Sequence, residues 1–184
     1  VTDVATGTGD LLIYWKEQAQ KNAVSIQKYV GVDPSVGMLE VAKTKVDFAE
    51  FIEGKAQELP IEDESTDVVS ISYGIRNVVD RVEALEEFYR ALKPNGIVMI
   101  LEFTKQERSG IVDKVVDFGM KKVLPKIGGF ISKNYEAYQY LPESIEEFLT
   151  TEMLSKELEE AGFEMKYTES FSMGISTLLV AQKK

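Results

Sequence analysis

The segment DVATGTGD, residues 3–10, decides the fold of this chain. Residues 1–4 have the character of the end of a buried strand and residues 11–20 have the spacing of a helix, so a glycine-rich turn joins the two. In open α/β sheets such turns lie at the carboxyl ends of the strands, where nucleotides bind. Because the chain begins within this strand, and an unsupported strand frays, we expect a further N-terminal segment ahead of Val1.

The same alternation of short strands and longer helices continues along the chain. Further strands are expected within residues 29–33, 48–53, 67–72 and 97–101, with helices after Pro34 and over 82–92. A helix over 153–160 and strands over 163–168 and 175–181 follow, and strands joined so closely favour an antiparallel edge hairpin. The pattern predicts one α/β domain over 1–184, with a mostly parallel sheet and helices on both faces.

Composition excludes several kinds of chemistry. The 184 residues contain no cysteine and no histidine, which excludes thiolate nucleophiles, imidazole bases and Cys/His metal sites, and we expect no metal. A net charge of −10 argues against nucleic acid as a partner. No run approaches the ~20 apolar residues of a membrane helix, and no signal segment is seen, so a cytoplasmic location is expected.

The glycine turn favours a cationic ligand over a dinucleotide. The third glycine of a dinucleotide fingerprint is missing, because Leu12 stands in its place. Asp10, near the start of the helix, would repel a diphosphate. S-adenosylmethionine instead brings a sulfonium and an amino group, which Asp3 at the end of the strand would attract. No phosphate-binding loop with its lysine occurs.

Asp33 strengthens this interpretation. It ends the second strand, 24 residues after Gly9, where an acidic residue is expected to accept hydrogen bonds from both ribose hydroxyls. The alternatives are a helix cap before Pro34 for Asp33, and a tight turn without a ligand for Gly7 and Gly9. Met38, one helical turn further on, either covers the adenine or packs in the core.

Four longer strings, supported by two short ones, resemble the demethylmenaquinone (ubiquinone/menaquinone) C-methyltransferase family. The strings are DVATGTGD (3–10), GVDPSVGML (31–39), SYGIRNVVDR (72–81), RALKPNGIVMILEFT (90–104), YLPESI (140–145) and GI (174–175). The resemblance implies a Rossmann-like, seven-stranded class I fold with an insertion over 105–150 that covers the substrate. It also implies transfer of a methyl group from S-adenosylmethionine to a ring carbon of a prenylated quinol. It also implies a cofactor site made by Asp3, Thr6, Gly7, Gly9, Asp33, Met38, Ala56 and Gln57.

The chain departs from the family pattern in three places. The family carries a segment before the first strand that helps to close the site. Lys55 stands before Ala56 where the family commonly has Asn or Asp, so the adenine amino group must find its acceptor on the backbone or on Gln57. Asn95 replaces a glycine in a turn that tolerates positive φ.

Methylation of a phenolic ring carbon requires the phenol, with a pKa of about 10, to become more acidic. Arg76 is the candidate cation for the oxyanion, Asn77 would hold the second oxygen, and Tyr73 would contact the ring. Glu102 is either a base or a cap of the next turn, and for Arg76 a surface salt bridge is the alternative. Other interpretations of the chain are a methyltransferase for another small molecule and a truncated S-adenosylmethionine-binding fragment without turnover.

The segment 105–133 differs in charge from the rest of the chain. It carries seven basic and three acidic residues and is amphipathic. We expect either peripheral contact with an anionic membrane, through which a lipid substrate would be collected, or a plain lid helix. Tyr135, Tyr138 and Tyr140 either line the quinone pocket or belong to the core.

Overall fold

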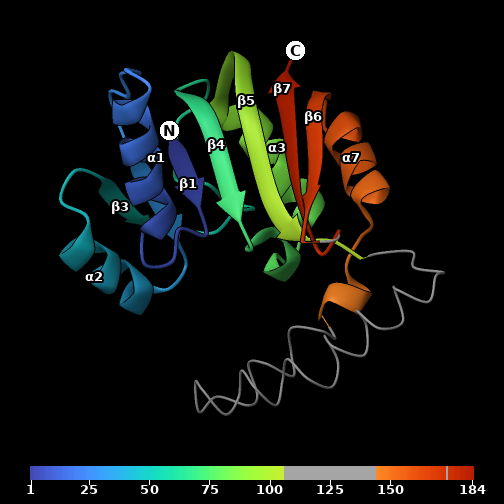
Figure 1. The fold of residues 1–184 in the computed structure, drawn as a ribbon, viewed down its shortest axis with the longest axis horizontal. Coiled ribbons are helices and arrows are strands. Elements are labelled where there is room, and N and C mark those ends of the chain that lie inside the picture. Colours follow the sequence, from blue (N-terminus) through green and yellow to red (C-terminus); the bar gives the residue numbers. More distant parts are fainter. Residues whose placement is uncertain (106–143, 173) are drawn as a thin grey trace.

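A computed structural model describes residues 1–105, 144–172 and 174–184. Its centre is a seven-stranded sheet in the order β3-β2-β1-β4-β5-β7-β6 (Figure 1). The strands are β1 (Thr2–Val4), β2 (Val30–Asp33), β3 (Glu50–Glu53), β4 (Thr66–Ser72), β5 (Leu92–Phe103), β6 (Phe163–Phe171) and β7 (Ser176–Lys183). Strands β1 to β5 pair in parallel, and β7 is antiparallel to both β5 and β6. The predicted fold class, including the antiparallel edge hairpin, is confirmed.

Helices cover both faces of the sheet. In Figure 1, α1 lies in front of the sheet and α3 behind it, and α7 packs beside β6 and β7. The helical elements are α1 (Asp10–Lys21), α2 (Val36–Lys45), the short 3-10 helix η1 (Ile75–Asn77), α3 (Arg81–Ala91) and α7 (Thr151–Glu160). The hydroxyl groups of Ser35 and Thr150 cap α2 and α7 by accepting a backbone N–H of the first turn, as residues of this type do.

The boundary between α3 and β5 differs from the sequence prediction. The helix expected over 82–92 ends at Ala91, and β5 begins at Leu92 rather than at Ile97. The reason is that Leu92 already pairs with Thr66 of β4, and a register shift between Thr66 and Val68 absorbs the intervening turn. Local turn residues could not reveal a pairing with a strand 26 residues away.

The hydrophobic core fixes the strand ends. All four residues of β2 are buried, and fully buried side chains such as Val32, Phe88 and Ile100 belong to one continuous cluster around the sheet. Close packing of this kind leaves the strands little freedom to shift. The carboxyl ends of β1, β2, β4 and β5 therefore meet at one edge in fixed positions, and the turns that follow them form the candidate site.

Two sequence predictions lie outside the described residues: nearly all of the basic segment 105–133, and Tyr135, Tyr138 and Tyr140. Within the described ranges, no helix is long and apolar enough to cross a membrane.

Candidate functional site

The glycine turn after β1 presents the start of α1 to the edge of the sheet. Gly9 is the N-cap of α1 with a φ of 79°, and Gly7 has a φ of 54°, values that glycine adopts without strain. A Cβ built on Gly7 would meet no atom within 4 Å, so this part of the turn faces open space. Within the turn, the Gly9 N–H donates to the Thr6 carbonyl at 2.9 Å.

Asp3 lies beneath this turn in a buried hydrogen-bond network. The Thr6 hydroxyl donates to one carboxylate oxygen at 2.7 Å, and the Ser70 hydroxyl donates to the other at 2.8 Å. The Trp15 indole N–H donates to Ser70 at 3.3 Å, which ties α1 to β4. Burial raises the pKa of Asp3 to about 6, while the hydrogen bonds from Thr6 and Ser70 oppose that change.

Asp33 binds the glycine turn from the end of β2. One carboxylate oxygen accepts the Gly7 N–H and the other accepts the Ser35 N–H, both at 2.8 Å. A carboxylate has about four acceptor positions, so each oxygen keeps one for a further donor. The cap of α2 is Ser35 rather than Asp33, so capping that helix does not explain Asp33.

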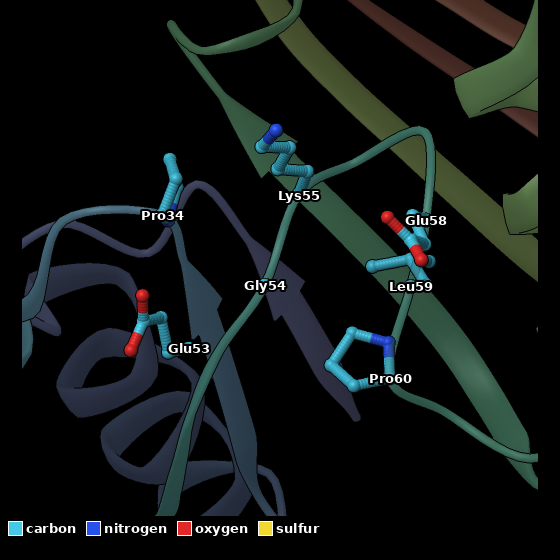
Figure 2. Close-up of a pocket in the computed structure, with 7 residues that line it drawn as sticks. All are labelled: Pro34, Glu53, Gly54, Lys55, Glu58, Leu59 and Pro60. Atoms are coloured by element: carbon cyan, nitrogen blue, oxygen red, sulfur yellow. The ribbon is translucent and has the colours of Figure 1, made fainter.

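A cleft of about 540 Å³ opens beside Asp33, at the carboxyl ends of β2 and β3. Figure 2 shows Gly54 at its middle, with Pro34 and Glu53 on one side and Leu59 and Pro60 on the other. Lys55 and Glu58 complete the lining. The Gly54 N–H donates to the Asp33 carbonyl at 3.2 Å, so the cleft and Asp33 belong to one structural unit.

The remaining residues predicted to bind cofactor have different environments. Ala56 belongs to the hydrophobic core, so its backbone rather than its methyl group is available, and Gln57 is partly exposed. Met38 is 49% exposed on α2 and takes no part in the core, which rules out core packing for it. Asp10 forms an exposed ion pair with Lys45 at 2.6 Å, so its charge repels a diphosphate less than the sequence suggested.

At the carboxyl ends of β4 and β5, the same edge of the sheet contains a buried ion pair between Arg76 in η1 and Glu102 in β5. We call this part the second half of the edge, and the glycine turn with the cleft the first half. The Arg76 guanidinium donates through Nη1 to the Glu102 carboxylate, and its Nε donates to the Ser144 hydroxyl at 3.0 Å. The side chain of Arg76 is 6% exposed and that of Glu102 is 0% exposed. This is a buried pair and not the surface salt bridge considered from the sequence. Burial raises the pKa of Glu102, although the nearby Arg76 charge opposes the rise.

Aromatic rings lie next to this pair. The Tyr73 and Phe103 ring centroids are 4.5 Å apart, and the Arg76 guanidinium lies 5.6 Å from the Phe103 ring. Tyr73 is 41% exposed, its φ is 55°, and its hydroxyl is 3.1 Å from the Ser176 hydroxyl of β7. A non-glycine residue in this backbone region is strained, and such residues concentrate at functional sites.

Gly74 brings the two halves of the edge into contact. A Cβ built on Gly74 would lie 2.6 Å from the Ala5 Cβ of the glycine turn, closer than real side chains approach. The backbone leading to Arg76 and Asn77 therefore passes directly against the turn that contains Thr6 and Gly7. Asn77 itself closes η1 through its backbone N–H, which donates to the Gly74 carbonyl at 3.0 Å.

Sequence reasoning missed four contacts of the site: Ser70, Trp15, Ser144 and Ser176. Ser70 is a buried polar residue between the apolar Val69 and Ile71 of β4, and this position was the available signal. Ser144 and Ser176 are far along the chain from their partners Arg76 and Tyr73. No local sequence pattern predicts these two contacts.

Comparison with known proteins places the chain in a family. The model of the ubiE/COQ5 methyltransferase family matches residues 1–183. The ubiquinone/menaquinone biosynthesis C-methyltransferase UbiE of Campylobacter jejuni serotype O:6 is 52% identical over 183 residues, covering 100% of this chain and 78% of that protein. The demethylmenaquinone methyltransferase of Chlorobaculum tepidum is 41% identical over 185 residues, covering 100% of this chain and 73% of that protein.

Solved structures agree on the fold. An S-adenosylmethionine-dependent methyltransferase from Aquifex aeolicus has a TM-score of 0.70 at 18% identity and covers 100% of this chain and 81% of that one. The [4+2]-cyclase SpnF also reaches a TM-score of 0.70, with 99% of this chain and 73% of that one covered at 18% identity. These structures show the fold, and a shared fold does not by itself identify a reaction. By the match of its whole length and its identity to these relatives, the chain belongs to the ubiE/COQ5 methyltransferase family.

Proposed function

We propose that the protein transfers a methyl group from S-adenosylmethionine to a ring carbon of demethylmenaquinol or a related prenylated quinol. The observation that carries this proposal is the arrangement of one sheet edge. A glycine turn with two buried carboxylates, Asp3 and Asp33, lies directly against the backbone of η1, which holds Arg76 beside the Tyr73 and Phe103 rings. A nucleoside site and a site for an oxygenated aromatic ring therefore adjoin each other.

The residues of the first half fit S-adenosylmethionine. The free acceptor positions of Asp33 suit two ribose hydroxyls, and the cleft lined by Pro34, Gly54 and Lys55 suits the adenine. Asp3 and the start of α1 would hold the methionine part. When bound, S-adenosylmethionine would supply a methyl group: its bond to sulfur breaks as the ring carbon forms its own bond to it, S-adenosylhomocysteine is left, and the ring carbon then gives up its hydrogen as a proton to water, which restores the aromatic ring.

The residues of the second half suit the quinol. A phenol with a pKa of about 10 is mostly protonated at neutral pH, so a donor that stabilises the oxyanion is needed. In the described part of the chain, Arg76 Nη2 has no hydrogen-bond partner, which leaves its N–H groups for a substrate oxygen. Tyr73 would pack on the ring, and Asn77 would bind the second oxygen.

The lipid nature of this substrate gives the basic segment 105–133 a role. Its excess of positive charge would hold the protein against the anionic inner face of a membrane, where prenylated quinols reside. Such contact would be peripheral and reversible.

Methyl incorporation tests the proposal. The protein is incubated with methyl-labelled S-adenosylmethionine and demethylmenaquinol in detergent, with the oxidised quinone as the matched control acceptor. We expect label in the lipid only from the reduced acceptor, because the oxidised ring has no phenol to ionise. Cofactor binding without any labelled lipid would support a binding fragment without turnover, and label appearing only in another small molecule would contradict the quinol assignment.

A further inference from the structure

Glu102 is the most enclosed charged side chain of the site. One carboxylate oxygen accepts the Phe103 N–H at 2.7 Å as well as Arg76 Nη1, and the other accepts the Arg76 backbone N–H at 3.1 Å. These contacts bind the carboxylate both to the guanidinium and to the backbone of η1. Arg76 is the charged side chain that faces Glu102 in the described part of the chain.

A direct role in proton transfer conflicts with this geometry. A general base must come within hydrogen-bond reach of the proton it removes. The side chain of Glu102 is 0% exposed, and Arg76 fills the space on its charged side. A substrate could reach this carboxylate only after displacing the guanidinium.

A role in stability alone also explains the pair poorly. Removing two charges from water is expensive, and apolar residues of the same volume often stabilise a protein as well or better. A cap of the turn would need the two backbone N–H groups but not the guanidinium. The buried pair must therefore be explained by what it does to Arg76.

We infer that Glu102 is a positioning residue, which orients the Arg76 guanidinium toward the substrate oxygen and exchanges no proton itself. This inference rests on the proposed function, in which Arg76 binds that oxygen. The guanidinium is planar, so holding Nη1 on Glu102 and Nε on Ser144 fixes its plane and the direction of Nη2. Glu102 also neutralises the buried charge of the guanidinium. Arg76 therefore stabilises the substrate oxygen through directed N–H hydrogen bonds rather than through a net positive charge.

A double-mutant cycle separates positioning from an independent role. The variants are Glu102→Gln, Arg76→Lys and the double variant, with kcat and S-adenosylhomocysteine affinity measured for each. Glu102→Gln should lower kcat on the order of 10²-fold, because small misplacements of a catalytic group have effects of that size. In the Arg76→Lys background the same change should alter kcat by less than about threefold, since the group being positioned is already gone.

Two further measurements distinguish orientation from disruption of the fold. Glu102→Asp, which keeps the carboxylate, should recover part of the lost kcat, and S-adenosylhomocysteine affinity should stay within about twofold in both variants. The matched control is Glu157→Gln, which removes the charge from another arginine-bound glutamate, the partner of Arg81 at 2.6 Å, and should retain parental kcat.

The possible contrary results have different meanings. If the losses of Glu102→Gln and Arg76→Lys multiply, or if Glu102→Gln removes a limb of the pH–kcat profile, Glu102 acts independently and positioning is overturned. Parental kcat in Glu102→Gln overturns it as well. Parental kcat in Arg76→Lys contradicts the role of Arg76 in the proposed function. The inference that Glu102 positions Arg76 is then overturned as well.

Discussion

The carboxylates of Asp3 and Asp33 differ in their hydrogen-bond donors, and this separates their roles. Asp3 is bound by two hydroxyl groups inside the protein, whereas Asp33 is bound by two backbone N–H groups and keeps acceptor positions beside the cleft. Their charges interact, since Asp33 contributes to the raised pKa of Asp3. We expect both to take part in the proposed cofactor site, Asp33 through its remaining acceptor positions and Asp3 also by holding the turn in place.

Asp33→Ala should weaken S-adenosylhomocysteine binding by about 1.5–3 kcal/mol, because hydrogen bonds to a charged acceptor are lost. Titration calorimetry measures this change. Asp67→Ala is the matched control, since Asp67 is an exposed carboxylate bound to Lys93 near the beginning of β4, and its replacement should leave the affinity unchanged. An unchanged affinity in Asp33→Ala would reduce Asp33 to a structural acceptor for Gly7 and Ser35.

Asp3 should make stability depend on pH. Its pKa is raised from 3.8 to about 6 in the folded protein, so between these values the folded state holds a proton that the unfolded state has lost. The stabilisation is complete below pH 3.8 and is lost as pH rises through about 6, a loss of about 3 kcal/mol in the free energy of unfolding.

Asp3→Asn removes this dependence, because an amide does not titrate. Urea unfolding of both proteins at several pH values isolates the effect from that of the other carboxylates. As the pH rises from 3.8 to about 6, the free energy of unfolding of the parent should fall relative to that of Asp3→Asn. A difference that stays constant with pH would show that Asp3 has an ordinary pKa.

The contact between η1 and the glycine turn couples the two halves of the site at the level of whole elements. Gly74 is the point of closest approach, with Ala5 and Ile71 around it. A side chain here would push η1 away from the glycine turn. Glycine is therefore required at Gly74 by the close approach of its backbone to the Ala5 Cβ.

Gly74→Ala should destabilise the fold by about 1–3 kcal/mol, a typical effect of overpacking, and should weaken cofactor binding as well. Gly37→Ala is the matched control, because Gly37 lies within α2 with no atom within 4 Å of an added Cβ. This control should instead raise stability by roughly 0.5–1 kcal/mol through helix propensity. Thermal unfolding measures both, and equal effects at the two glycines would contradict the proposed contact.

Local patterns predicted the elements themselves well, because each rests on short-range chemistry. The glycine turn, the acidic end of β2 and the terminal hairpin were all placed from neighbouring residues. The boundary at Leu92 was wrong because it depends on pairing with Thr66. The Arg76–Glu102 pair and the Ser144 contact were not predicted, since residues 26 and 68 positions apart meet only when the sheet and its loops are assembled.

For the molecule as a whole, charge is unevenly distributed along the chain. The protein carries a net charge of −10, yet residues 105–133 carry seven basic and three acidic residues. An acidic protein is repelled by anionic lipids, so any attraction must come from this segment.

Binding to anionic vesicles should therefore weaken as salt is added, and Lys114→Glu combined with Lys121→Glu should abolish it. Each lysine near an anionic surface contributes on the order of 1 kcal/mol. Vesicle sedimentation measures the bound fraction, with neutral vesicles as the control. Equal binding to neutral and anionic vesicles would leave 105–133 with only the role of a lid.

The proposed activation of the quinol by Arg76, at the edge formed by η1 and β5, is examined by measuring the kcat of Arg76→Lys. Lysine keeps the positive charge but cannot reproduce the planar set of donors that joins Glu102, Ser144 and the substrate oxygen. The account predicts a fall in kcat of about 10²–10³-fold, typical for the loss of one oxyanion donor, with S-adenosylhomocysteine affinity retained. A kcat within a few-fold of the parent would contradict it.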